Sequence, residues 1–407
     1  MSRHETTRQG PLAVNAGTYG SPGMSGLIRY TGELIDRIVE AEPDAVIFSG
    51  EQRGGDRWPG NVRRVPVRGY ELGSFSGNLK RLLWHQTLLP GALRRVGARA
   101  YYSPIPEGML RPVCPQVVTV HDIIPLRYPE WSPRQAHYYR HFLPRVLRAS
   151  SAVIAMSEAT ARDVREHFGL DVPIHVAYQG YRADAFRPRL AGEVARGRVA
   201  ELGDYLLTVA EARPYKNVDG LIRAFARASI PGVRLAVVGN IDGQRIDDLR
   251  TLPAELGIAD RVVFLGSVSD EELGALYRHA MGFVFPSQWE GFGIPALEAM
   301  GSGCPVAISQ VASLPEVCGD AALYFDPASV DSMAEALVRL VEDEAGRAEL
   351  TRRGVERARL FSYARCAEKI VQVIRSVTGE HAQVRPRARP APRETARAHP
   401  TASGTGE

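Results

Sequence analysis

The amino-acid sequence predicts an α/β protein with parallel sheets, divided into two domains. Short apolar segments typical of strands alternate with amphipathic helical segments along the chain, which is the order of successive βα units. At 407 residues the chain is longer than a single hydrophobic core usually grows, so two domains are expected. Hydrophobic residues make up 44% and charged residues 24% of the chain, as in ordinary water-soluble globular proteins.

Composition also bears on location and partners. The net charge of +4 is small, but arginines are frequent in the first half and in the C-terminal tail, which suits an anionic ligand or a membrane surface and requires neither. The four cysteines form no C-x-x-C pair and no zinc-type spacing, so reduced thiols are expected. No apolar run reaches the roughly 18 residues of a membrane span, and residues 1–10 have no apolar signal core. These features predict a cytoplasmic protein without a nucleic-acid partner.

The chain begins with a strand, a turn and a helix. Residues 11–15 predict the strand, residues 17–26 form a glycine-rich turn, and the following helix is amphipathic, with an apolar face made of Leu27, Ile28, Leu34, Ile35 and Ile38. The turn is not a G-x-G-x-x-G dinucleotide fingerprint. A tight connection between strand and helix and a phosphate-binding loop therefore explain it about equally well.

Residues 78–96 predict a helical region that is interrupted at Pro90-Gly91. Leucines and Trp84 lie on one side of it, and basic residues lie elsewhere: Lys80, Arg81, Arg94 and Arg95. Such a basic amphipathic element suits an anionic membrane, as a peripheral contact at the inner face, or an acidic acceptor. A core-facing helix with solvated arginines is the alternative, and it is favoured.

His121 and Asp122 follow a segment rich in β-branched residues. Residues 116–120 predict a strand, and polar side chains at the carboxyl end of a strand lie where open α/β sheets bind ligands. A lone histidine is usually structural, but this position favours a ligand-binding role for His121.

The remaining segments define the predicted domains. Residues 152–156 and 174–177 predict strands, and Ser157 predicts the N-cap of a helix. A linker is expected within residues 186–201, which places the domains at residues 11–190 and 200–360. Helices near residues 330–343, 345–360 and 363–377 end the fold. Residues 1–10 are expected to be flexible, and the Arg-, Pro-, Ala- and Thr-rich residues 380–407 are expected to be a disordered tail.

The second domain opens with cations placed for a diphosphate. Residues 205–209 predict a strand and residues 218–228 a helix, and Arg213 and Lys216 lie between them. Arginine offers phosphate a planar fork of donors, and lysine a mobile point charge. Cations are common at strand ends, so the spacing alone is a weak signal, and no P-loop G-x-x-x-x-G-K-[ST] is present.

The segment with the strongest chemical signal is residues 282–301. An apolar strand over residues 282–285 leads into a loop with Glu290, and Gly291 and Gly293 precede a helix that has Pro295 in its first turn. The open N–H groups of such a helix start, next to glycines that let a ligand approach the backbone, suit a phosphate.

Glu290 and Glu298 suggest a hydrolase pair, but their spacing argues against it. Eight residues of helix rise about 12 Å, whereas paired glycosidase carboxylates lie roughly 5–9.5 Å apart. Separate tasks along one extended ligand explain the two acids better: each accepts hydrogen bonds from hydroxyl groups, with phosphates held between them.

These motifs together resemble a known family. The run P-S-x-W-E-G-F-G-I-P-x-L-E-A-M-G-S-G-C-P-V at residues 286–306 resembles the E-x7-E signature of retaining glycosyltransferases of family 4. Three further segments resemble family motifs in the same order: G-x-x-G-x-x-R-Y from Gly23, T-V-H-D-x-I-P-L around His121, and R-x-x-K-N from Arg213. The family often has Pro-Asn-Gly at the hinge, whereas this chain has Tyr178-Gln179-Gly180. The resemblance covers roughly residues 11 to 375.

The resemblance implies a GT-B fold, in which two Rossmann-like domains face each other across a cleft and a helix over residues 361–379 returns to the first domain. It implies that Glu298 binds the ribose hydroxyls and Glu290 the donor sugar, with Arg213 and Lys216 on the diphosphate. The other donor contacts implied are His121 by the sugar, the backbone at Gly23 and Gly26, the residues by the base at Gly266, Ser267 and Val268, and the amides at Gly291, Phe292 and Gly293.

The expected function is transfer of a hexose from a GDP-, UDP- or dTDP-sugar to a hydroxyl of a saccharide, lipid-linked or small-molecule acceptor. Retention of anomeric configuration and no obligatory metal or other cofactor are implied. Similar family members build bacterial surface polysaccharides, often as mannosyl- or rhamnosyltransferases, so polysaccharide or glycoconjugate assembly is favoured over a small natural product. A GT-B epimerase or phosphorylase and a non-catalytic nucleotide-sugar-binding subunit are alternatives of other classes.

Overall fold

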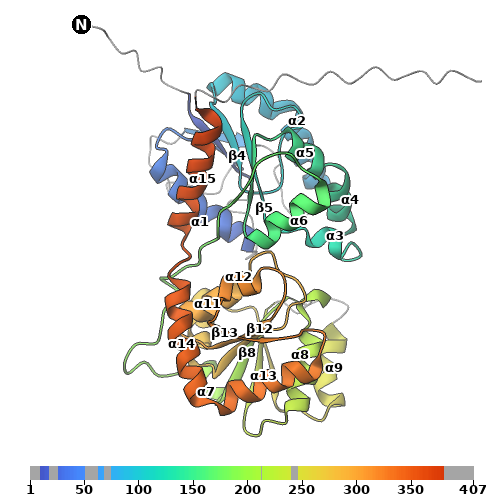
Figure 1. Ribbon diagram of the computed structural model, residues 1–407, viewed down its shortest axis with the longest axis vertical. Coiled ribbons are helices and arrows are strands. Elements are labelled where there is room, and N and C mark those ends of the chain that lie inside the picture. Colours follow the sequence, from blue (N-terminus) through green and yellow to red (C-terminus); the bar gives the residue numbers. More distant parts are fainter. Residues whose placement is uncertain are drawn as a thin grey trace, which may run out of the picture.

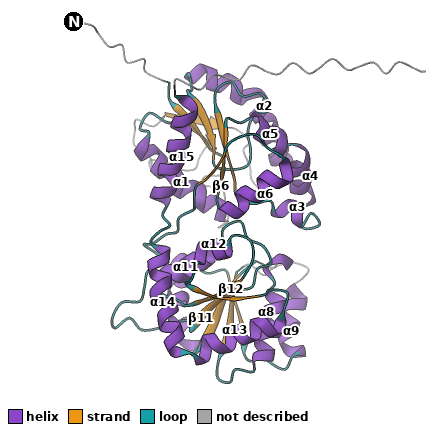
Figure 2. Ribbon diagram, in the orientation of Figure 1, coloured by secondary structure: helices purple, strands orange, loops and turns teal. Residues whose placement is uncertain are grey.

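The computed structural model describes residues 10–17, 26–50, 63–67, 75–211, 213–239 and 246–379. It contains two α/β domains, each built on one parallel sheet and drawn one above the other in Figure 1. Helices cover both faces of each sheet (Figure 2). The two-domain parallel α/β architecture expected from the sequence is confirmed.

The first domain has a sheet of order β3-β2-β1-β4-β5-β6-β7, and all neighbours pair parallel. Parallel pairing requires a crossover after each strand. The strands are β1 (Leu12–Ala16), β2 (Val46–Gly50), β3 (Arg63–Val67), β4 (Ala100–Ser103), β5 (Gln116–Val120), β6 (Ala152–Ala155) and β7 (Ile174–Val176). The helices are α1 (Gly26–Ala41), α2 (Phe75–Val96), α3 (Ile124–Arg127), α4 (Pro133–His141), α5 (Leu143–Ala149) and α6 (Glu158–Phe168).

The second domain has a sheet of order β10-β9-β8-β11-β12-β13, again parallel throughout. The strands are β8 (Tyr205–Val209), β9 (Arg234–Val238), β10 (Val262–Gly266), β11 (Gly282–Phe285), β12 (Val306–Ser309) and β13 (Ala322–Phe325). The helices are α7 (Arg198–Glu201), a 3-10 helix (Pro214–Lys216), α8 (Val218–Ala228), α9 (Ile246–Glu255), α10 (Asp270–His279), α11 (Ile294–Gly301), α12 (Leu314–Cys318), α13 (Val330–Glu342) and α14 (Glu344–Ala358).

The last helix crosses back to the first domain, as expected. Helix α15 (Tyr363–Thr378) packs along α1, and the two lie side by side in Figure 1. Arg375 Nη2 lies 2.9 Å from Glu42 Oε1, which ties the end of α15 to the segment after α1. The chain therefore connects its domains twice.

Helix α2 corrects one expectation, because it runs through Pro90 without the interruption that the sequence suggested. Proline removes one N–H from the helical ladder and usually kinks or ends a helix. Here Leu89 and Leu93, on either side of Pro90, are both buried in one apolar cluster with Tyr101 of β4. Packing of both halves against the same core holds the helix together.

Both sheets reverse their strand order at the first strand, between β1 and β4 and between β8 and β11. Ligands of such sheets bind beyond the carboxyl ends of the strands at this switch point. In the second domain these ends lead into residues 210–217 and 286–293, which contain the cations and one of the acids singled out above.

Candidate donor-binding site

Lys216 and Glu290 form an ion pair at the switch point of the second sheet. Lys216 ends the 3-10 helix after β8, and Glu290 lies in the loop after β11. Lys216 Nζ donates to Glu290 Oε1 at 2.6 Å, and the two side chains are 16% and 10% exposed. Burial alone lowers the pKa of Lys216, but the charge of Glu290 and the hydrogen bond raise it above its usual value. Lys216 is therefore a fixed positive charge inside the protein.

Asn217 holds the loops after β8 and β11 together. Its backbone is left-handed, with φ 54°, a conformation that asparagine tolerates better than most residues. From there its Nδ2 donates to Pro286 O at 3.2 Å and to Pro327 O at 2.9 Å. Asn217 belongs to the R-x-x-K-N motif but was given no role from the sequence.

Gly291 lies against the first domain. A Cβ atom placed on it would be 2.3 Å from His121 O and 2.8 Å from Asp122 Cβ. Only glycine therefore permits this contact between the loop that carries Glu290 and the loop that carries His121.

Gly293 and Phe292 complete the turn into α11. Gly293 precedes the helix with φ 95°, a backbone conformation that other residues rarely adopt. The Phe292 ring is buried, 5.8 Å from the Phe361 ring and 6.4 Å from the Tyr178 ring. Its side chain belongs to the core, so only the Phe292 backbone remains for a ligand.

His121 is neutral and has a defined tautomer. Its Nε2 lies 2.8 Å from Pro104 O, and a carbonyl only accepts, so Nε2 carries the hydrogen. Burial lowers the pKa of His121 to about 4. The ring meets Tyr30 edge to face at 4.7 Å between centroids. Nδ1 is therefore a lone-pair acceptor.

Asp122 is a further acid beside His121, and the sequence motifs assign it no role in the site. Its Oδ1 accepts the N–H of Ile124 at 2.9 Å. Burial raises the pKa of Asp122 to about 6, with the charge of Glu290 acting in the same direction and the Ile124 bond and Lys216 opposing it. Its position directly after His121, where β5 ends, is the feature of the sequence that could have identified Asp122 as a site residue.

Glu298 lies on α11 and is held by the first domain. Arg29 of α1 donates from Nη1 to Glu298 Oε1 at 3.1 Å and from Nη2 to Asp270 Oδ1 at 2.7 Å. Arg182 donates to the other Asp270 oxygen at 2.8 Å. Burial raises the pKa of Glu298 to about 8, and Arg29 opposes that rise. Glu290 and Glu298 thus have different cationic partners.

Arg213 lies outside this buried cluster. Its side chain is 42% exposed, and its Nε is 3.6 Å from Glu211 Oε2. It precedes the 3-10 helix that ends at Lys216, so it is a partly exposed cation three residues from the buried one.

The remaining expected contacts differ in how well the structure accounts for them. Gly266 ends β10, and Ser267 and Val268 follow it and lead toward Asp270, which accepts from Arg29 at 2.7 Å. Gly26 begins α1, and a Cβ placed on it would meet no more distant part of the described chain within 4 Å. Gly23 lies outside the described residues.

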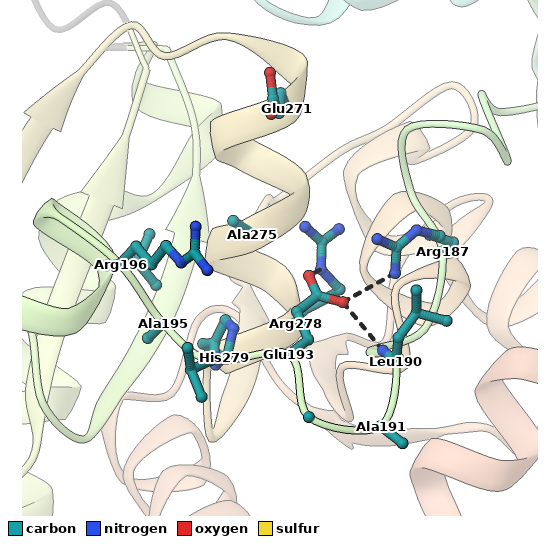
Figure 3. Close-up of a pocket in the computed structure, with 13 residues that line it drawn as sticks. Arg187, Leu190, Ala191, Glu193, Ala195, Arg196, Glu271, Ala275, Arg278 and His279 are labelled. Carbon is teal, nitrogen blue, oxygen red and sulfur yellow. Dashed lines mark hydrogen bonds and ion pairs between the residues drawn. The ribbon is translucent and has the colours of Figure 1, made fainter.

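A separate pocket of about 530 Å³ lies between the linker and α10 (Figure 3). Glu193 accepts there from Arg187 Nη1 at 3.0 Å, from the Leu190 N–H at 3.0 Å and from Arg278 Nε at 2.7 Å. Glu193 therefore pairs with two of the basic side chains that line the pocket, and none of the lining residues belongs to the site described above. The pocket belongs to the connection between the linker and the second domain.

Comparisons with known proteins agree with this architecture. A model described as Glycosyltransferase Family 4 matches residues 24–184, and one described as Glycosyl transferases group 1 matches residues 196–360. The chain is 29% identical over 373 residues to O-antigen chain mannosyltransferase B of Escherichia coli, covering 86% of this chain and 95% of that protein.

Two solved structures have the same fold. Sucrose-phosphate synthase of Thermosynechococcus elongatus has a TM-score of 0.73 and 21% identity, covering 90% of this chain and 99% of that one. HepE of Anabaena, solved with UDP and glucose, has a TM-score of 0.66 and 18% identity, covering 90% and 100%. Both likenesses extend over the two domains.

Within the described residues no helix is both long and apolar enough to cross a membrane. One glycosyltransferase family model matches each of the two domains, and both sheets have the Rossmann-like strand order. The chain belongs to glycosyltransferase family 4, has the GT-B fold and is a glycosyltransferase.

Proposed function

We propose that this enzyme transfers a hexose from a nucleotide sugar to an acceptor hydroxyl, with retention of anomeric configuration, during assembly of a cell-surface polysaccharide or glycoconjugate. One observation carries the proposal: the buried Lys216–Glu290 pair lies at the switch point of the second sheet, directly beside the His121 loop of the first domain. A fixed cation and a carboxylate side by side suit a sugar bonded to a diphosphate.

The diphosphate lies against Lys216, Arg213 and the N–H groups at the start of α11. Positive charge held in place before reaction stabilises the negative charge that develops on the leaving diphosphate, without reorganisation. These side chains supply the charge that a metal provides in other enzymes, so transfer without an obligatory metal is part of the proposal. Undiminished activity in a chelator such as EDTA is the corresponding expectation.

The sugars occupy the two ends of this site. Glu298 accepts hydrogen bonds from the ribose hydroxyls, which requires Arg29 to share or release its carboxylate. Glu290 and the Nδ1 atom of His121 accept from hydroxyls of the transferred hexose. Closure of the two domains over the donor keeps water from consuming it.

The donor and acceptor classes are proposed from the relatives. A mannosyltransferase of O-antigen synthesis is similar over nearly its whole length, so mannose and a saccharide or lipid-linked acceptor are the first candidates. HepE was solved with UDP and glucose, so UDP-glucose belongs in the same test as GDP- and dTDP-sugars. A small-molecule acceptor is the second candidate.

Helix α2 is proposed as a contact with the inner face of an anionic membrane. Leu79, Leu83 and Leu88 are 47%, 52% and 67% exposed. Its other exposed residues include the cations Lys80, Arg94 and Arg95, and the helix sequence contains no acid. Apolar side chains between cations bind the interface of anionic bilayers. Arg81 is excluded from this face because it pairs with Glu107 at 2.8 Å.

Sedimentation with lipid vesicles tests the membrane contact. The full chain should bind vesicles containing phosphatidylglycerol and not vesicles of phosphatidylcholine alone. Charge reversal at Lys80, Arg94 and Arg95 should abolish binding, whereas reversal at the exposed Arg250 of α9 should not. Equal sedimentation of all three proteins would refute the proposal.

A thermal-shift screen with GDP-, UDP- and dTDP-sugars tests the transferase proposal. A ligand at about 100 times its Kd stabilises the folded state by about 2.7 kcal/mol, which is readily seen. The donor found in this way is then incubated with and without acceptor, and the product anomer is read by NMR. Transfer with retention supports the proposal; conversion of donor alone to another sugar indicates an epimerase.

A further inference from the structure

Helix α6 of the first domain is capped by a carboxylate of the second. The N–H of Glu158 donates to Glu316 Oε1 at 2.6 Å, and the N–H of Ala159 donates to Glu316 Oε2 at 3.1 Å. The first N–H groups of a helix have no partner within it, and its N-terminus favours negative charge. Glu316 lies on α12, which faces α6 between the domains in Figure 1, so this cap crosses the interface.

The same turn of α6 is bonded to both loops of the donor site. Ser157 Oγ accepts the N–H of Thr160 at 3.0 Å and donates to Gly291 O at 2.8 Å. Thr160 Oγ1 lies 3.2 Å from His121 O and 3.1 Å from Gly291 O. Each hydroxyl has one hydrogen, so both carbonyls are satisfied when Ser157 donates to Gly291 and Thr160 to His121.

Helix α12 is itself fixed at both ends. Ser313 Oγ, just before it, donates to Glu290 O at 3.0 Å. Arg357 of α14 donates to Glu316 O at 2.6 Å and to Val317 O at 2.9 Å. The position of the Glu316 backbone is therefore linked to that of Glu290.

We propose that Glu316 and the Thr160 hydroxyl are positioning residues that hold the two domains in the arrangement used for transfer. They act through the backbones of Gly291, His121 and the first turn of α6, and not through the side chains assigned to the donor. The inference rests on the proposed function, because it requires a donor between His121 and Glu290. Opening of the domains exposes Glu316 and the α6 N–H groups to water, and closing re-forms the cap.

This role separates two measurable quantities. Lys216 and Glu298 both belong to the second domain, so affinity for a nucleoside diphosphate does not depend on the cap. Transfer depends on closure, so kcat falls when the cap is lost. A less closed site also admits water, so the ratio of donor hydrolysis to transfer rises.

The experiment uses the full chain and the nucleotide sugar identified in the thermal-shift screen. Glu316→Ala, Glu316→Gln, Thr160→Val and Thr160→Ser are compared with wild type and with Glu335→Ala, a control at an exposed acid of α13. Loss of a helix cap corresponds to a fall of about 2- to 30-fold in kcat for Glu316→Ala. Thr160→Val removes the hydrogen bond to His121 O, worth about 0.5–1.5 kcal/mol, or roughly 2- to 13-fold in kcat. Glu316→Gln and Thr160→Ser retain an acceptor or a hydroxyl and should be closer to wild type.

The inference is supported if kcat falls and hydrolysis rises while calorimetric affinity for the nucleoside diphosphate stays at the wild-type value. It is overturned if Glu316→Ala has wild-type kcat and hydrolysis, or if nucleotide affinity and kcat fall together, which a merely structural role predicts. If the wild-type protein neither binds nor transfers any sugar nucleotide, the proposed function itself is contradicted. That outcome differs from a failure of the cap proposal alone, in which wild type still binds and transfers.

Discussion

Lys216 Nζ lies 2.6 Å from Glu290 Oε1, although 74 residues separate them in the sequence. The pairing results from strand order, because β8 and β11 are neighbours in the sheet and both loops leave it at their carboxyl ends. The two residues stabilise each other's charge in a buried place. In the proposed donor complex, the diphosphate contacts Lys216 and the hexose contacts Glu290.

Replacement of Lys216 by alanine should impair catalysis strongly. It removes a charge-assisted contact worth about 1.5–3 kcal/mol, which corresponds to roughly 10- to 150-fold in kcat/KM. Steady-state transfer kinetics measure the effect. Lys369→Ala, at an exposed lysine of α15, is the control. Wild-type kinetics in a folded Lys216→Ala protein would contradict the assignment of Lys216 to the donor site.

Donor affinity should depend on pH through Glu298. Its pKa of about 8 means that the carboxyl group holds a proton at neutral pH, whereas acceptance from two ribose hydroxyls favours the ionised form. Affinity should therefore rise with pH, by at most about tenfold per unit, and level off above pH 8. Calorimetry with the nucleotide sugar avoids the titration of a terminal phosphate.

Glu298→Gln provides the matched test of that dependence. The amide cannot ionise, so the variant should bind more weakly and show no slope between pH 6 and 8. Glu335→Gln is the control and should retain the wild-type slope. A slope that persists in Glu298→Gln would assign the titration to another group.

Gly291→Ala should separate nucleotide binding from transfer. Its Cβ would lie 2.3 Å from His121 O, so the two loops must move apart. Overpacking of this kind costs about 1–3 kcal/mol, or roughly 5- to 150-fold in kcat if closure is needed for transfer. Nucleoside diphosphate affinity should change much less. Gly91→Ala in α2, where a Cβ meets no atom within 4 Å, is the control.

Arg213→Ala should weaken donor binding without destabilising the protein. The side chain is 42% exposed, so the free energy of unfolding should change by less than about 0.5 kcal/mol. Its attraction for the diphosphate should diminish as salt is raised, because exposed charges are screened. A loss of donor affinity of equal size at low and high salt would contradict a role as a partly exposed charge.

The sequence predicts best the elements whose signal is local. The apolar runs at residues 116–120, 205–209 and 282–285 coincide with β5, β8 and β11, and Ser157 caps α6 as expected. Strands β2, β3 and β4 were not predicted individually. The continuity of α2 through Pro90 depends on tertiary packing, and this packing cannot be inferred from the local sequence around the proline.

The contacts across the domain interface have no local signal. Arg29 pairs with Glu298 across 269 residues, and Glu316 caps a helix 158 residues earlier. Such pairs follow from how the domains dock, whereas periodicity and motif spacing report only neighbours along the chain. The motif around His121 and Asp122 indicated the right loop but not which carbonyl holds the imidazole.

The most direct test of the donor site is calorimetric titration of the full chain with GDP, UDP and dTDP. Wild type should bind at least one of them, and Lys216→Ala and Glu298→Gln should each weaken that binding by about tenfold or more, the effect of one charge-assisted contact. Folded wild-type protein that binds none of the three, or three proteins that bind equally well, would contradict the account.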